Sequence, residues 1–279
     1  MLNAGDSQRV AELMRETAAA ELLPRFRTLA KEDIRFKRPG DVVTVADVES
    51  EQRLAAGLAR ILPGVPVVGE EAVEKDRGLL ELIGRPGETC WIVDPLDGTA
   101  NFAAGKDRFA MIICLVHDGL AVGGWILDVP RGRMAVALAG QGVALDGAAV
   151  HGTPPARPLI GAVGFKLQKE FDRQLPAAAR QQLGRVSSLR CAGIEYLEML
   201  SSRTDFCLYR RTMPWDHAAG ALMLAEAGGG AVRFDGQPYA PAQPTNAGLI
   251  AAAHPQTLAQ VMALFEAVQL PLLAGLPKA

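Results

Sequence analysis

The stretch that decides the fold reads Cys90-Trp-Ile-Val-Asp94-Pro-Leu-Asp97-Gly-Thr99-Ala-Asn-Phe102. Its first four residues are apolar and β-prone, so they predict a strand that ends at Asp94. The proline that follows fixes a bend, which lets the carboxylates of Asp94 and Asp97 face one point. Gly98 and Thr99 open a predicted helix, whose first backbone N–H groups can bind a phosphate. The stretch therefore predicts a carboxylate pair beside an anion-binding turn.

Three further places put acids at the ends of apolar strands or the starts of helices: Asp47, Glu70-Glu71, and Asp216 directly after Trp215. Taken singly, each has a structural explanation, since Asp47 and Asp216 are good helix caps and the glutamates could form a solvated turn. Taken together, they indicate carboxylates that converge on one edge of a sheet. Carboxylate oxygens are the ligands that Mg²⁺ prefers, and a cation removes their mutual repulsion. We therefore expect a magnesium site beside the phosphate-binding turn.

Composition excludes several other classes of protein. The 279 residues carry 29 Lys and Arg against 31 Asp and Glu, a net charge of -2, so no basic excess is present for nucleic acid. Apolar residues make up 49% of the chain, as in a globular protein. The longest dense apolar run, 109–116, is too short to cross a membrane, and charges between residues 6 and 16 interrupt any secretory signal. Four cysteines without a CxxC pair indicate buried thiols, and we expect a cytoplasmic protein.

Periodicity predicts amphipathic helices over 6–30 and 48–62 and a strand-rich region over 109–150. A proline-rich segment at 151–158 is the best candidate boundary, and strands and helices alternate beyond it. We therefore expect a mixed α/β protein with an α+β subdomain over 1–150 and an α/β subdomain over 151–279. The two are expected to form one compact catalytic unit, with most metal ligands in the first and Asp216 and the substrate wall in the second.

Three motifs resemble the signature of the inositol monophosphatase family, which belongs to the lithium-sensitive, magnesium-dependent phosphomonoesterases. They are Glu70-Glu71, the stretch from Trp91 to Phe102, and Trp215-Asp216-His-Ala-Ala-Gly220, in the family's order. The resemblance implies a layered αβαβα sandwich, as in phosphatases of the inositol monophosphatase and fructose-1,6-bisphosphatase type. It also implies a homodimer that hydrolyses a small phosphorylated metabolite by direct attack of water activated by two or three Mg²⁺ ions.

The resemblance also assigns roles to residues that match its motifs. Glu70, Asp94 and the carbonyl of Leu96 would bind the first magnesium. Asp94, Asp97 and Asp216 would bind the second, and Glu70 would contact a weaker third. The attacking water would be oriented or deprotonated by Thr99 with Asp47, and the amides of Gly98 and Thr99 would hold the phosphate. Positions around the site would be taken by Lys37, Asp41 and Glu71.

The substrate wall departs from the family pattern. Many members have a glutamate seven residues before the aspartate of the Trp-Asp motif, and Tyr209 stands there in this chain. The substrate-binding positions implied by the resemblance are Gly193, Ile194, Glu195, Tyr209 and Arg210. Arg210 and Arg211 either recognise a second anionic group or are solvated. Inositol phosphates, sugar bisphosphates and phosphonucleotides therefore remain open as substrates. His217 is expected to be a packing residue.

Two alternatives differ in chemistry. A haloacid dehalogenase-like phosphatase would attack with an aspartate and form an aspartyl-phosphate. In this chain two residues separate Asp94 from Asp97, where that class has one, and that scheme has no role for Glu70-Glu71. The second alternative is a catalytically weak regulatory or binding protein of the same fold.

Overall fold

A computed structural model describes residues 2–38, 41–155, 157–243, 246 and 248–268. Its larger sheet has seven strands in the order β3-β4-β5-β6-β7-β8-β9. The sheet is antiparallel except for the parallel pair β3–β4. The strands are β3 (Val67–Gly69), β4 (Thr89–Asp97), β5 (Ala110–His117), β6 (Leu120–Asp128), β7 (Arg133–Leu138), β8 (Val143–Leu145) and β9 (Ala148–Val150). The strand-rich pattern expected over 109–150 is thus confirmed.

Strand β5 explains why this sheet has helices on both faces. Its apolar residues alternate between two cores because successive side chains point to opposite faces. Ile112 and Cys114 belong to the core between the two sheets, whereas Met111, Ile113 and Leu115 belong to the core under the first helices. A strand without a polar face must be covered on both sides.

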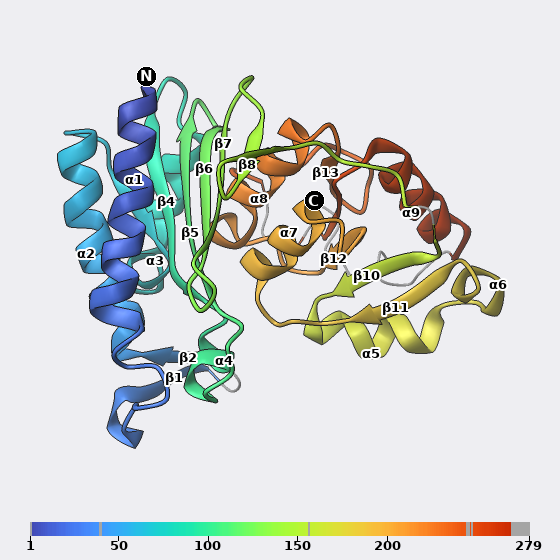
Figure 1. Ribbon diagram of the computed structural model, residues 1–279, viewed down its shortest axis with the longest axis horizontal. Helices are drawn as coiled ribbons and strands as arrows, with labels where there is room; N and C mark the ends of the chain where they lie inside the picture. Colours follow the sequence, from blue (N-terminus) through green and yellow to red (C-terminus); the bar gives the residue numbers. More distant parts are fainter. Residues whose placement is uncertain (1, 39–40, 156, 244–245, 247, 269–279) are drawn as a thin grey trace.

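Helices α1 (Ala4–Thr17) and α2 (Val45–Ile61) cover the outer face of this sheet (Figure 1). Val10, Met14, Leu54 and Leu58 are fully buried there and lie in one core with Trp91. The expected helix over 6–30 is too long. After α1, a π-helical segment (Ala18–Leu22) precedes a turn region, and Pro24 has no N–H to continue a helix.

A second sheet has five strands in the order β11-β10-β12-β14-β13. Its strands are β10 (Leu159–Val163), β11 (Leu183–Ser187), β12 (Phe206–Tyr209), β13 (Gly230–Val232) and β14 (Leu249–Ala252). Two helices, α7 (Ala192–Leu200) and α8 (Pro214–Glu226), lie between the two sheets (Figure 1). The far face of the second sheet is covered by α5 (Phe165–Gln174), α6 (Ala177–Arg180) and α9 (Pro255–Val268).

The layers therefore follow the order helix, sheet, helix, sheet, helix, which confirms the expected αβαβα sandwich. The chain leaves the first sheet at Val150 and enters the second at Leu159. Helix α8 nevertheless packs against β4, β5 and β6 of the first sheet. The division into subdomains at 150 stays a prediction. In the described residues, no helix is both long and apolar enough to cross a membrane.

Short elements complete the fold near the ends of the first sheet. They are a 3-10 turn (Lys31–Asp33), the hairpin of β1 (Ile34–Arg38) and β2 (Asp41–Thr44), helix α3 (Glu70–Lys75), a 3-10 segment (Arg77–Gly84) and helix α4 (Thr99–Ala103). The hairpin leads directly into α2, whose cap is Thr44.

Neither Asp47 nor Asp216 occupies the cap position that was one structural explanation for it, although Asp47 takes part in the capping box of α2. Asp47 lies one turn inside α2, where its side chain accepts from the backbone N–H of Thr44 in a capping box. The cap position of α8 is Met213, and Asp216 lies in the first helical turn behind Pro214. Neither aspartate therefore serves as a simple N-cap.

Candidate metal and phosphate site

Asp94 and Asp97 lie at the end of β4, and a bulge places them on the same side of the sheet. In a regular strand, residues three apart point to opposite faces. The pairing of β4 with β5 shifts register between Asp94 and Asp97, so one residue is inserted and the alternation is reset. Asp94 Oδ1 also accepts the backbone N–H of Leu96 at 3.0 Å, which fixes its carboxylate.

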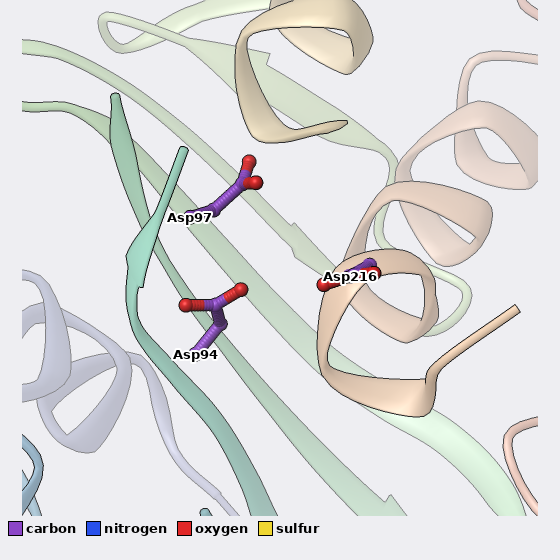
Figure 2. Close-up of side chains that lie close together, drawn as sticks. All are labelled: Asp94, Asp97 and Asp216. Atoms are coloured by element: carbon purple, nitrogen blue, oxygen red, sulfur yellow. The ribbon is translucent and has the colours of Figure 1, made fainter. Parts of the chain in front are cut away.

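Asp216 reaches the same point from the other side. Figure 2 shows Asp94 and Asp97 projecting from β4 towards the first turn of α8, which carries Asp216. One carboxylate oxygen from each of the three lies within 4.8 Å of the others. We call Asp94, Asp97 and Asp216 the aspartate cluster. Among the described residues, it is the group of acidic, histidine or cysteine side chains with the spacing of a metal site.

The environment disfavours three negative charges at this point. Burial raises the pKa of Asp94 well above its ordinary value, and the charges of Glu70, Asp97 and Asp216 raise it further. Burial also raises the pKa of Asp97, against the backbone N–H groups that it accepts. A hard divalent cation would relieve this repulsion, and every oxygen in the cluster is a ligand of the kind that Mg²⁺ takes. The donor set therefore fits the expected metal.

Glu70 and Glu71 begin α3, beside the cluster. Lys37 Nζ donates to Glu70 Oε1 at 3.0 Å and to Glu71 Oε1 at 2.5 Å. Burial raises the pKa of Glu70 to about 8; Lys37 opposes this shift, and the charge of Asp216 adds to it. The two glutamates hold the pKa of Lys37 above its ordinary value, although burial of the ammonium acts in the opposite direction. An ammonium group thus already compensates the glutamates next to the cluster.

Glu51, on α2, holds the start of α3 in place. Its two carboxylate oxygens accept the backbone N–H groups of Glu71 and Ala72, each at 2.8 Å. A Cβ on Gly69 would lie 2.2 Å from one of those oxygens, so the residue before Glu70 has to be glycine for this contact. The position of Glu70 therefore depends on a carboxylate nineteen positions earlier in the chain.

Thr99 and Asp47 form the expected pair. Thr99 Oγ1 lies 2.9 Å from Asp47 Oδ1 and 2.9 Å from the carbonyl oxygen of Leu96, so its single proton has two possible acceptors. Asp47 Oδ2 accepts from the N–H of Thr44 at 2.8 Å and from its hydroxyl at 2.6 Å. Burial raises the pKa of Asp47 to about 7, against these hydrogen bonds. Near neutral pH this carboxyl is therefore able to take up a proton.

Gly98 and Thr99 begin α4, as expected. Gly98 has a φ of 87°, a left-handed conformation that favours glycine. A Cβ on it would lie 2.8 Å from the carbonyl oxygen of Arg108. Asn101 Nδ2, in the same turn, donates to the carbonyl oxygens of Arg108 and Leu189 at 2.8 and 3.0 Å. The turn is thereby tied to the loop before α7.

The same loop also fixes the second oxygen of Asp97. Asp97 Oδ2 accepts the N–H of Gly193 at 2.6 Å and the thiol of Cys191 at 3.1 Å. A Cβ on Gly193 would lie 2.8 Å from the Cβ of Ala110, so only glycine brings this amide so close. Ile194 is buried in the core between the sheets, and its side chain packs away from the cavity described next.

A cavity of about 480 Å³ adjoins the cluster. Among the described residues, it is lined by Asp97, Gly164, Leu167, Ser188, Arg190, Cys191, Ala192, Glu195, Tyr209, Arg210, Arg211, Asp216 and His217. Tyr209 donates its hydroxyl to Glu195 Oε2 at 2.6 Å, and Glu195 Oε1 accepts the N–H of Leu189 at 2.8 Å. Burial raises the pKa of Glu195 to about 7. Glu195 therefore brings a carboxylate beside the tyrosine that stands at the family's glutamate position.

His217 packs against the same tyrosine. Its ring centroid lies 4.5 Å from that of Tyr209, and its two nitrogens contact the hydroxyl of Tyr196 and the carbonyl oxygen of Arg211. Burial lowers the pKa of His217 to about 4, so the ring is neutral at pH 7. The side chain of Asp41 lies outside the described part of the structure.

Sequence reasoning missed several residues that hold this site together. Glu51 lies inside a helix without a local signal. Asn101 and Cys191 act through loops that only the fold brings together. The thiol pattern indicated buried cysteines, and all four are buried and free, but it did not indicate that one of them contacts Asp97.

The model of the family described as the inositol monophosphatase family matches residues 7–270. The relative named Nus factor SuhB from Pseudomonas aeruginosa is 31% identical over 231 residues, which cover 78% of this chain and 82% of the relative. An inositol-1-monophosphatase from Bacillus subtilis is 28% identical over 206 residues, with 72% and 76% covered.

A solved structure of an IMPase from Thermotoga maritima has the same fold. Its TM-score is 0.74 and its sequence identity 22%, with 92% of this chain and 97% of that chain covered. The family's match extends over nearly the whole chain and includes every element that carries the cluster. The chain therefore belongs to the inositol monophosphatase family, and it is an enzyme of the phosphatase kind.

Proposed function

We propose that the protein is a Mg²⁺-dependent phosphomonoester hydrolase that acts on a small phosphorylated metabolite by direct attack of water. The observation that carries this proposal is the convergence of Asp94, Asp97 and Asp216 within 4.8 Å, beside the Thr99–Asp47 pair. Membership of the family and the name of the relative from Bacillus subtilis support an inositol monophosphate-like or sugar phosphate substrate.

The aspartate cluster, with Glu70 and the carbonyl of Leu96, would hold two to three magnesium ions. When bound, the ions would supply Lewis acidity that lowers the pKa of water and neutralises phosphate charge. Asp97 would use Oδ1 for this role, because Oδ2 is engaged by Gly193 and Cys191. When a cation contacts Glu70, the ammonium group of Lys37 would give up its hydrogen bond to Glu70 and keep the one to Glu71.

The proton of the attacking water would pass to Thr99 Oγ1 as the threonine proton moves to Asp47 Oδ1. The 2.9 Å contact between these atoms supports the relay, and so does the pKa of Asp47 of about 7, which suits a base near neutral pH. The contacts from Thr44 hold the carboxylate while it accepts the proton. The amides of Gly98 and Thr99 would bind the phosphoryl oxygens, because the first N–H groups of a helix have no acceptor within it.

The remainder of the substrate would lie in the cavity beyond Asp97. Tyr209, Glu195 and Arg210 line this cavity, whereas Gly193 contributes its amide to Asp97 instead. Ile194 would support α7 from the core. The hydroxyl and carboxylate of the Tyr209–Glu195 pair are suited to the hydroxyl groups of a sugar or cyclitol.

The test is phosphate release from a panel of inositol phosphates, sugar bisphosphates, histidinol phosphate and 3′-phosphonucleotides, with Mg²⁺ and with EDTA. We expect release that requires Mg²⁺, is inhibited by lithium, and incorporates one solvent oxygen directly into phosphate. Burst kinetics with a trapped aspartyl-phosphate would instead support the haloacid dehalogenase-like alternative. One relative is named a Nus factor, so a binding role is the second candidate, and absence of release from every substrate would support it.

We further expect a homodimer and a cytoplasmic location. The four free, buried cysteines are consistent with a reducing compartment. Light scattering of the purified protein would test the first expectation, and cell fractionation would test the second.

A further inference from the structure

Three phenylalanine rings from separate segments of the chain meet at the helix that carries Thr99. Phe26 follows the π-helical segment (Ala18–Leu22), Phe102 lies in α4, and Phe109 directly precedes β5. The ring centroid of Phe26 lies 5.7 Å from that of Phe102 and 4.9 Å from that of Phe109, and the last two are 5.0 Å apart. Each ring therefore packs against both of the others at the distances of favourable aromatic pairs.

Helix α4 depends on such contacts for its position. It has five residues, and helices this short are not stable by themselves. Phe102 and Phe109 are buried, whereas Phe26 is half-buried. The backbone N–H of Phe102 donates to the carbonyl oxygen of Gly98 at 3.0 Å, which places the Phe102 ring within one turn of Thr99. A shift of Phe102 would therefore move Thr99 Oγ1 relative to Asp47 Oδ1.

A long helical turn brings Phe26 to this place. The backbone N–H of Leu23 donates to the carbonyl oxygen of Ala18 at 2.9 Å, five positions earlier, where an α-helix would use four. Ala18 and Leu22 are buried, and Phe26 follows at the same spacing of four residues. In a regular α-helix this spacing drifts away from the buried face, because one turn takes 3.6 residues. The π-helical turn thus keeps all three side chains on the side of the core.

Arg27 holds the ring of Phe26 against α4. Its guanidinium carbon lies 4.8 Å from the centroid of that ring. Arg27 Nε donates to the carbonyl oxygen of Gly105 at 3.0 Å, and the N–H of Gly105 donates to the carbonyl oxygen of Phe102 at 2.9 Å. The φ of Arg27 is 66°, in the left-handed region that residues with a Cβ rarely adopt. The segment after α1 is therefore attached to α4 at two points, through a ring and through a hydrogen bond.

We propose that Phe26 is a positioning residue for the hydrolysis, because it holds α4 where Thr99 Oγ1 contacts Asp47. The proposal rests on the proposed function for the role of Thr99. Phe26 is not among the described residues that line the cavity beside the aspartate cluster, so it acts through α4 and not on the substrate. A displacement of about 1 Å caused by a distant substitution can cost about a hundredfold in rate, and a smaller shift of Thr99 is expected when one ring is lost.

The first experiment compares variants of Phe26 in steady-state phosphate release. We expect Phe26→Ala to lower kcat by about tenfold and to leave the Mg²⁺ concentration for half-maximal activity within about twofold. Phe26→Tyr keeps the ring and should retain most of the activity. The matched control is Val10→Ala, since Val10 is fully buried on α1 in the core against which Phe26 packs. Its truncation should lower Tm but leave kcat within about twofold of the wild type.

The same substitution in a Thr99→Val background tests whether Phe26 acts through Thr99. In that background Phe26→Ala should lower kcat by no more than about twofold, because the hydroxyl that it positions is already absent. An equally large fall in both backgrounds would overturn the proposal, as would a Phe26→Ala enzyme with the kcat of Val10→Ala.

If the wild type releases no phosphate from any substrate of the panel, the proposed function has failed, and backbone hydrogen exchange decides separately whether Phe26 holds α4. Peptides that cover residues 99–105 should exchange about tenfold faster in Phe26→Ala than in the wild type or in Val10→Ala. Equal exchange in the three proteins would exclude this role of Phe26.

Discussion

The Thr99–Asp47 pair can be broken without touching a metal ligand, by Thr99→Val. Valine keeps the shape of threonine but removes the hydroxyl that lies 2.9 Å from Asp47 Oδ1. If the pair relays the proton of the attacking water, kcat should fall by about 10²- to 10⁴-fold. That range corresponds to about 3 to 5 kcal/mol of lost transition-state stabilisation. Asp47 keeps both contacts from Thr44, so the loss of stability should stay within about 1–3 kcal/mol.

The pH profile gives a second readout. The Thr99 hydrogen bond lowers the pKa of Asp47, which burial has raised to about 7, so its removal should raise that pKa further. A base with a higher pKa becomes active at higher pH, and the acidic limb of the residual activity should shift upwards. The assay is steady-state phosphate release with Mg²⁺, with calorimetry of Mg²⁺ binding as a check that the ligands are intact. Thr99→Ser is the matched control and should retain most of the activity. A Thr99→Val enzyme with kcat within about threefold of the wild type would refute the relay.

Three further predictions concern the groups around the cluster. Burial raises the pKa of Glu70 to about 8, so the contribution of this group to the free energy of unfolding is present at acidic pH and is lost as pH rises through about 8. Mg²⁺ should therefore raise Tm more at pH 8 than at pH 6.5 in thermal unfolding. The lowered pKa of His217, about 4, changes the stability of the protein only below pH 6.5, so it does not affect this comparison. An equal gain in Tm from Mg²⁺ at both pH values would contradict the role of Glu70. Glu51→Gln should put an amide N–H against a backbone donor of α3 and lower the free energy of unfolding in denaturant by about 1–3 kcal/mol. It should also raise the Mg²⁺ concentration for half-maximal activity, and an unchanged Mg²⁺ dependence would show that Glu51 does not position Glu70. Gly98→Ala should reduce kcat at least about tenfold, because the new Cβ would lie 2.8 Å from the carbonyl oxygen of Arg108 and alanine would be strained in the left-handed backbone. Wild-type kinetics of this variant would exclude a tight turn at residue 98.

The sequence predicted the ends of the central strands well, because the pattern there is strong. The apolar run before Asp94 and the strand-like pattern over 109–150 indicated strands, and the structure adds that β4 and β5 are buried on both faces. The convergence of Asp94 and Asp97 was expected from a proline bend, and the structure adds its physical cause, a bulge that resets the side-chain alternation. At Asp94 and Asp97 the local sequence pattern and the strand pairing of the folded sheet therefore lead to the same arrangement.

Contacts between distant segments could not be predicted in the same way. The cap of α2 is an exception, because Thr44 and Asp47 form a local capping box that sequence reasoning overlooked. Glu51, Asn101 and Cys191 look ordinary in sequence, and each gains its contact from a loop or helix far along the chain. The strained backbone of Arg190 likewise has no local signal, since the sequence alone suggests no turn that requires a positive φ.

The central claim is that the aspartate cluster is the catalytic metal site of a phosphatase, and Asp94→Asn tests it most directly. Asp94 lies at the centre of the charge network, and asparagine preserves its shape while it removes one negative charge. The measurement is phosphate release against Mg²⁺ concentration for the wild type and the variant, on the best substrate of the panel, with circular dichroism to verify the fold. The account predicts Mg²⁺-dependent release by the wild type and almost none by a folded variant at any Mg²⁺ concentration. A folded Asp94→Asn enzyme with full activity would contradict it.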